Sequence, residues 1–132
     1  MKFMVTSNIF LFIPVIAAAW VHEWVYFTIA LLASITSPIY HYVVEFYLSK
    51  IYLHNTVRAM DWSIALCAYA YMFYYIFTNT AHLFKIPLLL CLTATIIFFW
   101  YGFKININKY KKTHPWFHII TSIISGIIVL SK

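Results

Sequence analysis

The chain has 132 residues, of which 64% are hydrophobic and only 9% are charged, and its formal net charge is +6. A water-soluble domain of this size cannot hide so much apolar surface, because small domains keep a large ratio of surface to volume. The composition therefore excludes an ordinary soluble domain. The positive charges are scattered between apolar runs, which also disfavours a nucleic-acid-binding surface. We expect residues 1–132 to form a single transmembrane helical domain.

Five apolar runs follow one another along the chain, and each is long enough to cross a bilayer. Lipid cannot satisfy a bare backbone and no strand-like alternation is visible, so these runs predict helices. The expected fold is an all-α, polytopic integral membrane protein with about five transmembrane helices. The runs cover roughly Phe3–Val21, Trp24–Leu48, Trp62–Asn79, Pro87–Phe103 and His114–Leu130.

The polar segments between the runs predict where the helices end. His22 and Glu23 form a tight turn after the first run. A loop is expected before Asp61, which would then cap the third helix. Pro115 is tolerated best in the first helical turn, so His114 should begin the last helix. The loop before Asp61 contains Lys50, His54, Asn55 and Arg58; the later connections contain His82 and Lys85, then Lys104, Lys109, Lys111 and Lys112.

The basic residues predict the orientation, because Lys and Arg in short loops favour the cytoplasmic side. With the N-terminus inside, seven of the nine Lys and Arg residues lie on the inner side and two, Lys85 and Lys132, lie outside. The inner residues are Lys2, Lys50, Arg58, Lys104, Lys109, Lys111 and Lys112. The sequence therefore predicts an N-in, C-out topology.

Ionisable residues within membrane spans are costly, so each is a candidate for function. In the predicted topology His41, Asp61, His114 and His118, together with Ser37, fall in the inner half of three helices. Ser37 and His41 are four residues apart, as are His114 and His118, so each pair shares a helix face.

Two His at this spacing can grip one metal, and a third from another helix gives three protein ligands. Three ligands plus water is the pattern of a catalytic zinc site. The predicted metal ligands are His41, His114 and His118. Asp61 would accept a proton or orient the water, and Ser37 would donate a hydrogen bond.

Each of these residues also has a simpler interpretation. A single His in a span can be a hydrogen-bonded packing residue, and a His pair at a helix start can anchor the helix at the interface. Two His from different helices can also be the axial ligands of a haem. Glu45 either pairs with Lys50 or Arg58, or orients His41 from behind.

Three motifs resemble the CREST superfamily of membrane hydrolases, which unites alkaline ceramidases with the progestin and adipoQ receptors. Ser37-Pro38-Ile39-Tyr40-His41 resembles its SxxxH motif, and Met60-Asp61-Trp62 its Asp-bearing third helix. The stretch HPWFHIITSIISG, residues 114–126, resembles its last-helix HxxxH motif. The order along the chain is that of the family.

The resemblance implies zinc held by three histidines, corresponding here to His41, His114 and His118. It also implies that Ser37 and Asp61 lie near the metal-bound water. The family usually has seven spans, so this chain would be a shortened member. Its lipid cavity would then be smaller, or completed by another subunit in a homo-oligomer. Pro115 within the HxxxH motif is a second departure.

The expected function is a zinc-dependent intramembrane hydrolase that cleaves a lipid amide (ceramide-like) or ester bond, with a membrane lipid as substrate. Two alternatives remain at this point. One is a non-enzymatic membrane receptor or remodelling protein with a structural zinc site, and the other is a haem-binding membrane electron carrier.

The topology predicts that the segment around Arg58 and the segment Lys104–Lys112 both face the cytoplasm. Single cysteines placed at Arg58 and Lys109, with Cys67 and Cys91 changed to Ser, should react with a membrane-impermeant thiol reagent only after permeabilisation. A cysteine at Lys85 is the control and should react from outside. Labelling of either inner position in sealed cells would contradict the topology.

Overall fold

The computed structural model describes residues 6–46, 51–105 and 107–132. These residues form one short 3-10 helix and five α-helices, and no strand occurs among them. The all-α prediction is therefore confirmed, and the number of α-helices among these residues agrees with the five that were expected. In chain order the elements are η1 (Ser7–Leu11), α2 (Phe12–Trp20), α3 (Trp24–Phe46), α4 (Ile51–Thr78), α5 (His82–Ile105) and α6 (Ile107–Leu130).

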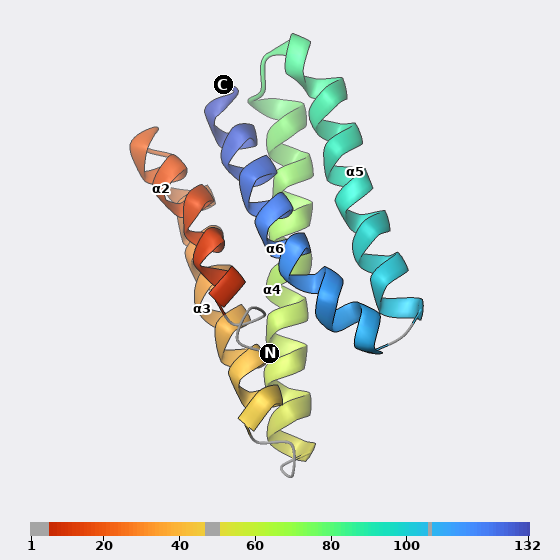
Figure 1. Cartoon of the computed structure of the whole chain (residues 1–132). Coiled ribbons are helices and arrows are strands. Elements are labelled where there is room, and N and C mark those ends of the chain that lie inside the picture. The colour runs from red at the N-terminus through yellow and green to blue at the C-terminus, as the bar shows by residue number, and fades with distance from the viewer. Residues whose placement is uncertain (1–5, 47–50, 106) are drawn as a thin grey trace.

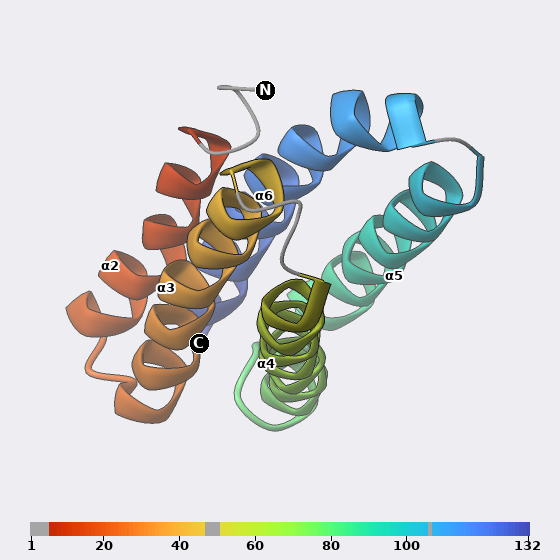
Figure 2. The same ribbon diagram turned by 90° about the horizontal axis from the view of Figure 1, so that it is seen from below.

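The helices form a bundle in which α6 packs against both α2 and α5, while α3 packs against α2 and α4 (Figures 1 and 2). The contacts of α4 with α5 and α6 are sparser. The tight turn at His22 and Glu23 is present as predicted, and His22 adopts a positive φ of 58° to make it. This turn, the α4–α5 turn and the C-terminus all lie at one end of the bundle (Figure 1).

Helix α4 begins much earlier than the apolar pattern suggested. It starts at Ile51, so the predicted loop with Asn55 and Arg58 is helical. Asp61 lies about three turns inside this helix, and the prediction that it caps the helix is wrong. The physical reason is that residues 51–61 contain neither Gly nor Pro. A helix can therefore continue past its apolar segment while the polar side chains reach water. The side chains of Lys50 and His54 lie outside the described residues.

Helix α6 also begins early, at Ile107, so Pro115 lies inside it and His114 is not its first residue. A proline in a helix cannot donate to the carbonyl four residues before it and usually bends the helix. The first turns of α6, light blue in Figure 1, run at a clear angle to the rest of the helix. The expectation that Pro115 must occupy the first turn is therefore wrong, because the helix accommodates it by bending.

The apolar core lies in the half of the bundle that holds the two tight turns. Its buried members come from all five helices: Val15, Ala17, Ala18, Tyr26, Ala30, Met72, Tyr75, Ile76, Leu88, Leu92, Ile128 and Val129. The C-terminal residues close this end. The Ala81 amide donates to the Ser131 carbonyl at 3.0 Å, and Lys132 forms an ion pair with Glu23. The buried residues of the opposite half include the polar side chains of Ser37, His41, His114 and His118.

Two segments of the described chain, His82–Tyr101 and Lys112–Leu130, are long and apolar enough to cross a membrane by length and composition. The apolar helical stretch Ser7–Trp20 is shorter than such a span. The five-span topology stays a prediction.

At Gly126, α6 packs closely against α2. A Cβ atom added there would lie 3.0 Å from Cγ2 of Ile13. We predict that Gly126→Val lowers the free energy of unfolding by about 1–3 kcal/mol, because the added methyl groups overpack this contact. Adding Ile13→Ala should restore part of the loss. Thermal unfolding of the detergent-purified protein is the measurement, with Ile127→Val at an exposed position as control. An unchanged Gly126→Val melting temperature would contradict the close packing.

Candidate metal centre

Three imidazoles meet in the half of the bundle opposite the apolar core. His41 comes from α3, and His114 and His118 come from one face of α6. The Nε2 atom of His41 lies 3.0 Å from that of His114 and 3.1 Å from that of His118. The Nε2 atoms of His114 and His118 are 3.0 Å apart. All three side chains are buried. The three predicted ligands therefore come together at one point.

This arrangement suits a cation better than a set of hydrogen bonds. A neutral imidazole nitrogen either donates or accepts, so one shared proton can satisfy only one of three mutual contacts at a time. A metal ion accepts all three lone pairs at once. Tetrahedral ligands bonded to zinc at about 2.0–2.1 Å lie about 3.3 Å from one another. The observed 3.0–3.1 Å separations are close to this spacing. The donor set and its burial thus fit zinc.

The other ring nitrogen of His41 is the atom through which a metal-bound histidine is usually oriented. Nδ1 of His41 is buried and has no hydrogen-bond partner among the residues that the structure describes. A metal-bound His usually donates its other N–H to a carboxylate, a carbonyl or water. Glu45, one turn further along α3, was predicted to fill this role or to pair with a basic residue. Its side chain lies outside the described residues.

Aromatic rings hold His114 in place. The ring centroid of Phe117 lies 5.8 Å from that of His114, and that of Phe99 on α5 lies at the same distance. Phe99 and Phe117 also contact each other, with centroids 4.8 Å apart. These rings exclude water from one side of the centre and restrict the rotamer of His114. His114 contacts both other histidines although Pro115 follows it directly and the helix bends there.

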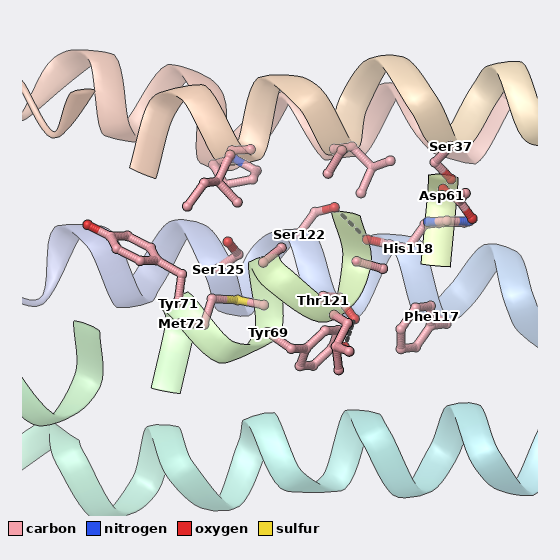
Figure 3. A pocket seen from close by; sticks show the side chains of 18 of the residues that line it. Ser37, Asp61, Tyr69, Tyr71, Met72, Phe117, His118, Thr121, Ser122 and Ser125 are labelled. Atoms are coloured by element: carbon pink, nitrogen blue, oxygen red, sulfur yellow. Dashed lines mark hydrogen bonds between the residues drawn. The ribbon is translucent and has the colours of Figure 1, made fainter. Parts of the chain in front are cut away.

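Ser37 and Asp61 lie beside the three histidines. Ser37 is buried one turn before His41 on α3, and Asp61 reaches in from α4. The Ser37 hydroxyl and the Asp61 carboxylate face each other next to His118 (Figure 3). Asp61 is only partly buried, so its carboxylate remains open to an adjoining space. The two residues predicted to assist the metal thus occupy the expected neighbourhood.

That space is a cavity of about 450 Å³ between α3, α4 and α6, with further walls from η1, α2 and α5. Ser37, Asp61 and His118 lie at one end of it, and Tyr71 and Met72 lie at the other (Figure 3). His114, which contacts His118, also lines the cavity. Most of the wall between the two ends is apolar. The apolar and aromatic wall includes Leu11, Pro14, Ile29, Ala30, Ala33, Trp62, Ala65, Leu66, Ala68, Ile96, Phe99 and Phe117.

A polar stripe on α6 was missed by the sequence analysis. Ser122 and Ser125 continue the spacing of His114 and His118 along the same face and line the same cavity. Ser122 donates to the His118 carbonyl at 2.5 Å, so it packs the ligand helix. The continued three- and four-residue spacing was the available signal.

A second missed group has no such local signal. The Tyr69 hydroxyl lies 3.1 Å from the hydroxyls of both Thr95 and Thr121. These residues come from α4, α5 and α6, so only the tertiary structure shows that they meet. Together they link three helices beside the cavity.

We predict about one zinc ion per chain in the purified protein, lost when His41, His114 or His118 is changed to Ala. Among the described residues the cluster consists of three imidazoles, so removing any one leaves too few ligands. Elemental analysis of folded protein is the measurement, and His82→Ala, at an exposed histidine, is the matched control. Well-folded wild-type protein without zinc would rule out the site.

The chain was compared with family models, with curated proteins and with solved structures, and no match was found in any of the three. The inference of function therefore starts from the residues of the site and from the three short motifs that they form.

Proposed function

We propose that the protein is a zinc-dependent intramembrane hydrolase that cleaves an amide or ester bond of a lipid. The observation that supports this most directly is the convergence of three imidazole nitrogens within 3.1 Å beside a carboxylate, at one end of an apolar cavity. Zinc ligands, a proton carrier and a binding space for hydrocarbon are thus adjacent. No one of the three features would suffice alone.

The surface of the bundle supports a membrane setting. Large apolar side chains are exposed on every helix, for example Trp20, Leu66 and Leu83 at 81%, 72% and 80% exposure. In water, apolar patches of this extent would associate. In this proposal all five helices span the bilayer with the N-terminus inside, and lipid covers these side chains.

Exposed threonines on the spans are consistent with this setting. Thr28, Thr36 and Thr93 each donate to the carbonyl four residues earlier, at 2.8–2.9 Å. Such internal bonds satisfy a hydroxyl where no water is present.

In the proposed reaction, zinc and the residues of the chain have different roles. Zinc, when bound, lowers the pKa of a water to about 7 and polarises a carbonyl. Asp61 takes a proton from the attacking water and later delivers it to the leaving nitrogen or oxygen. A carbon–oxygen bond forms, the bond to the leaving group breaks, and the products are a carboxylic acid and an amine or alcohol. Ser37 orients Asp61 or donates to the carbonyl oxygen, which becomes negative in the transition state.

The number of ligands favours a catalytic over a purely structural zinc. Structural sites usually have four protein ligands, whereas catalytic sites have three and keep one position open. Three histidines form the cluster among the described residues. The open position would face the cavity, where Asp61 lies.

The haem alternative is disfavoured by the same distances. Axial ligands bind from opposite faces of a porphyrin. The Nε2 atoms of His41 and His118 are 3.1 Å apart, which leaves no room for a ring between them.

The resemblance to the CREST superfamily also supports the hydrolase proposal, because the three motifs that resemble the family contain the residues that meet at the site. Ser37 and His41 come from one motif, Asp61 from the second, and His114 and His118 from the third. The described part of the chain has five α-helices where the family usually has seven, so we propose a shortened member with a smaller lipid cavity.

We predict that Asp61→Asn retains zinc but lowers hydrolysis by about 10²- to 10⁴-fold, the usual contribution of a general acid–base group. Asn keeps the shape but cannot accept the proton, and Asp61 lies within α4 rather than at its end, so no helix cap is lost. Ser37→Ala should cause a smaller decrease. The measurement is turnover of a panel of N-acyl and ester lipids, with zinc content determined in parallel.

Glu23→Gln is the matched control. It also replaces a carboxylate by an amide, but at the far end of the bundle, where Glu23 pairs with Lys132. It should leave turnover unchanged. Full activity in Asp61→Asn would move the proton-carrying role to Glu45. Zinc-loaded wild-type protein that hydrolyses no lipid in the panel would favour a structural or receptor role.

A further inference from the structure

The end of the cavity far from the histidines is closed by a cluster of tyrosines. The ring centroid of Tyr26 on α3 lies 5.7 Å from that of Tyr71 and 5.3 Å from that of Tyr75, both on α4. The contacts are edge-to-face, which is a favourable geometry for aromatic pairs. Tyr26 and Tyr71 line the cavity, and the fully buried Tyr75 stands behind them. Tyr26, Tyr71 and Tyr75 are called the tyrosine floor below.

The tyrosine floor is fixed to the helices on both sides. The Tyr26 hydroxyl donates to the Ser125 carbonyl at 3.1 Å and lies 2.8 Å from its hydroxyl oxygen, which ties α3 to α6. Tyr26 and Tyr75 both belong to the buried apolar core. A ligand would therefore have to break core contacts to pass beyond this point. Met72, buried at 4% exposure, lines the cavity at the same end (Figure 3).

The distance from the metal centre to the floor follows from α6. Ser125, which contacts the floor, is seven residues beyond His118. A helix rises 1.5 Å per residue, so this separation is about 10 Å. An extended hydrocarbon chain advances about 1.3 Å per carbon at ordinary bond lengths and angles. About eight carbons therefore fit in a straight line between the reacting carbonyl and the floor.

The cavity is open along α4, where Leu66 lines it and is still 72% exposed. A chain longer than the straight depth can leave by this side. The additional carbons would then contact lipid both before and after binding, and they would contribute little affinity.

We propose that the tyrosine floor, together with Met72, sets how much of an acyl chain is bound inside the cavity, about eight carbons counted from the reacting carbonyl. This inference rests on the proposed lipid hydrolase function, because it assigns the cavity to the hydrocarbon part of the substrate. Affinity should rise about fourfold per methylene group, the usual effect of burying one, until the chain reaches the floor. Beyond that length it should level off.

A binding experiment tests the role of the tyrosine floor directly and does not require the protein to hydrolyse the lipid. The full-length, zinc-loaded protein in lipid nanodiscs is incubated with a fluorescent fatty acid, which is displaced by saturated fatty acids of increasing length. In wild-type protein the displacement constants should level off at about eight carbons. Met72→Ala opens the floor and should move this point two or three carbons longer. Met72→Trp fills it and should move the point shorter. Leu90→Ala, at a residue 66% exposed and outside the cavity, should change nothing.

The two Met72 variants shift the profile in opposite directions, so a folding defect in one does not remove the test. An identical profile in wild type and both variants would overturn the inference, as would displacement independent of chain length. Asp61→Asn should keep the wild-type binding profile while losing turnover. If neither the wild-type protein nor any variant hydrolyses lipid but the chain-length profile shifts as expected, the hydrolase proposal is wrong and the role of the tyrosine floor is supported. If lipid is hydrolysed but the profile does not shift, the hydrolase proposal is supported and the role of the tyrosine floor is wrong.

Discussion

The structure is organised around three buried imidazoles whose Nε2 atoms are 3.0–3.1 Å apart. At these distances hydrogen bonds among the three neutral rings cannot satisfy all three nitrogens at once, whereas a cation could accept a lone pair from each. A bound zinc ion would turn this unfavourable contact into a crosslink between α3 and α6. The same ion would define the reactive point to which Ser37, Asp61 and the cavity are all adjacent. The geometry of the site and the stability of that half of the bundle would thus depend on one interaction.

The two halves of the bundle contain different features. The half with the tight turns contains the apolar core and the ion pair of Glu23 with Lys132, and it is closed by the C-terminal residues. The half with the histidines contains the candidate metal centre, Asp61 and the end of the cavity beside them. Packing in the apolar core holds the helices together at one end, so the cavity between them can stay open for a ligand. The tyrosine floor lies where the two halves meet.

Helix α6 connects these features. Its histidines belong to the metal centre, its serines line the cavity, and its end packs in the core. Gly126 allows α2 to approach it closely, and Pro115 bends its first turns away from the axis. The hydroxyl contacts of Tyr26 with Ser125 and of Tyr69 with Thr121 link it to α3 and α4. Hydrogen bonds of this kind are effective between helices where water does not compete.

The sequence by itself determined the helical class, the turn at His22 and Glu23, and the candidate ligands, because hydrophobic runs and four-residue spacings are local properties. It also predicted that His41 lies near His114 and His118. That prediction depended on the similar depth of the three residues in the predicted membrane spans and on the order of the three motifs. The sequence misplaced the starts of α4 and α6. Polar residues do not by themselves end a helix when no Gly or Pro intervenes, and Pro115 is accommodated by a bend. Only the tertiary structure decided that the three Nε2 atoms meet, that Asp61 lies mid-helix facing Ser37, and that tyrosines from two helices close the cavity. These are contacts between residues far apart in the chain, and they depend on how whole helices pack rather than on any neighbouring residues.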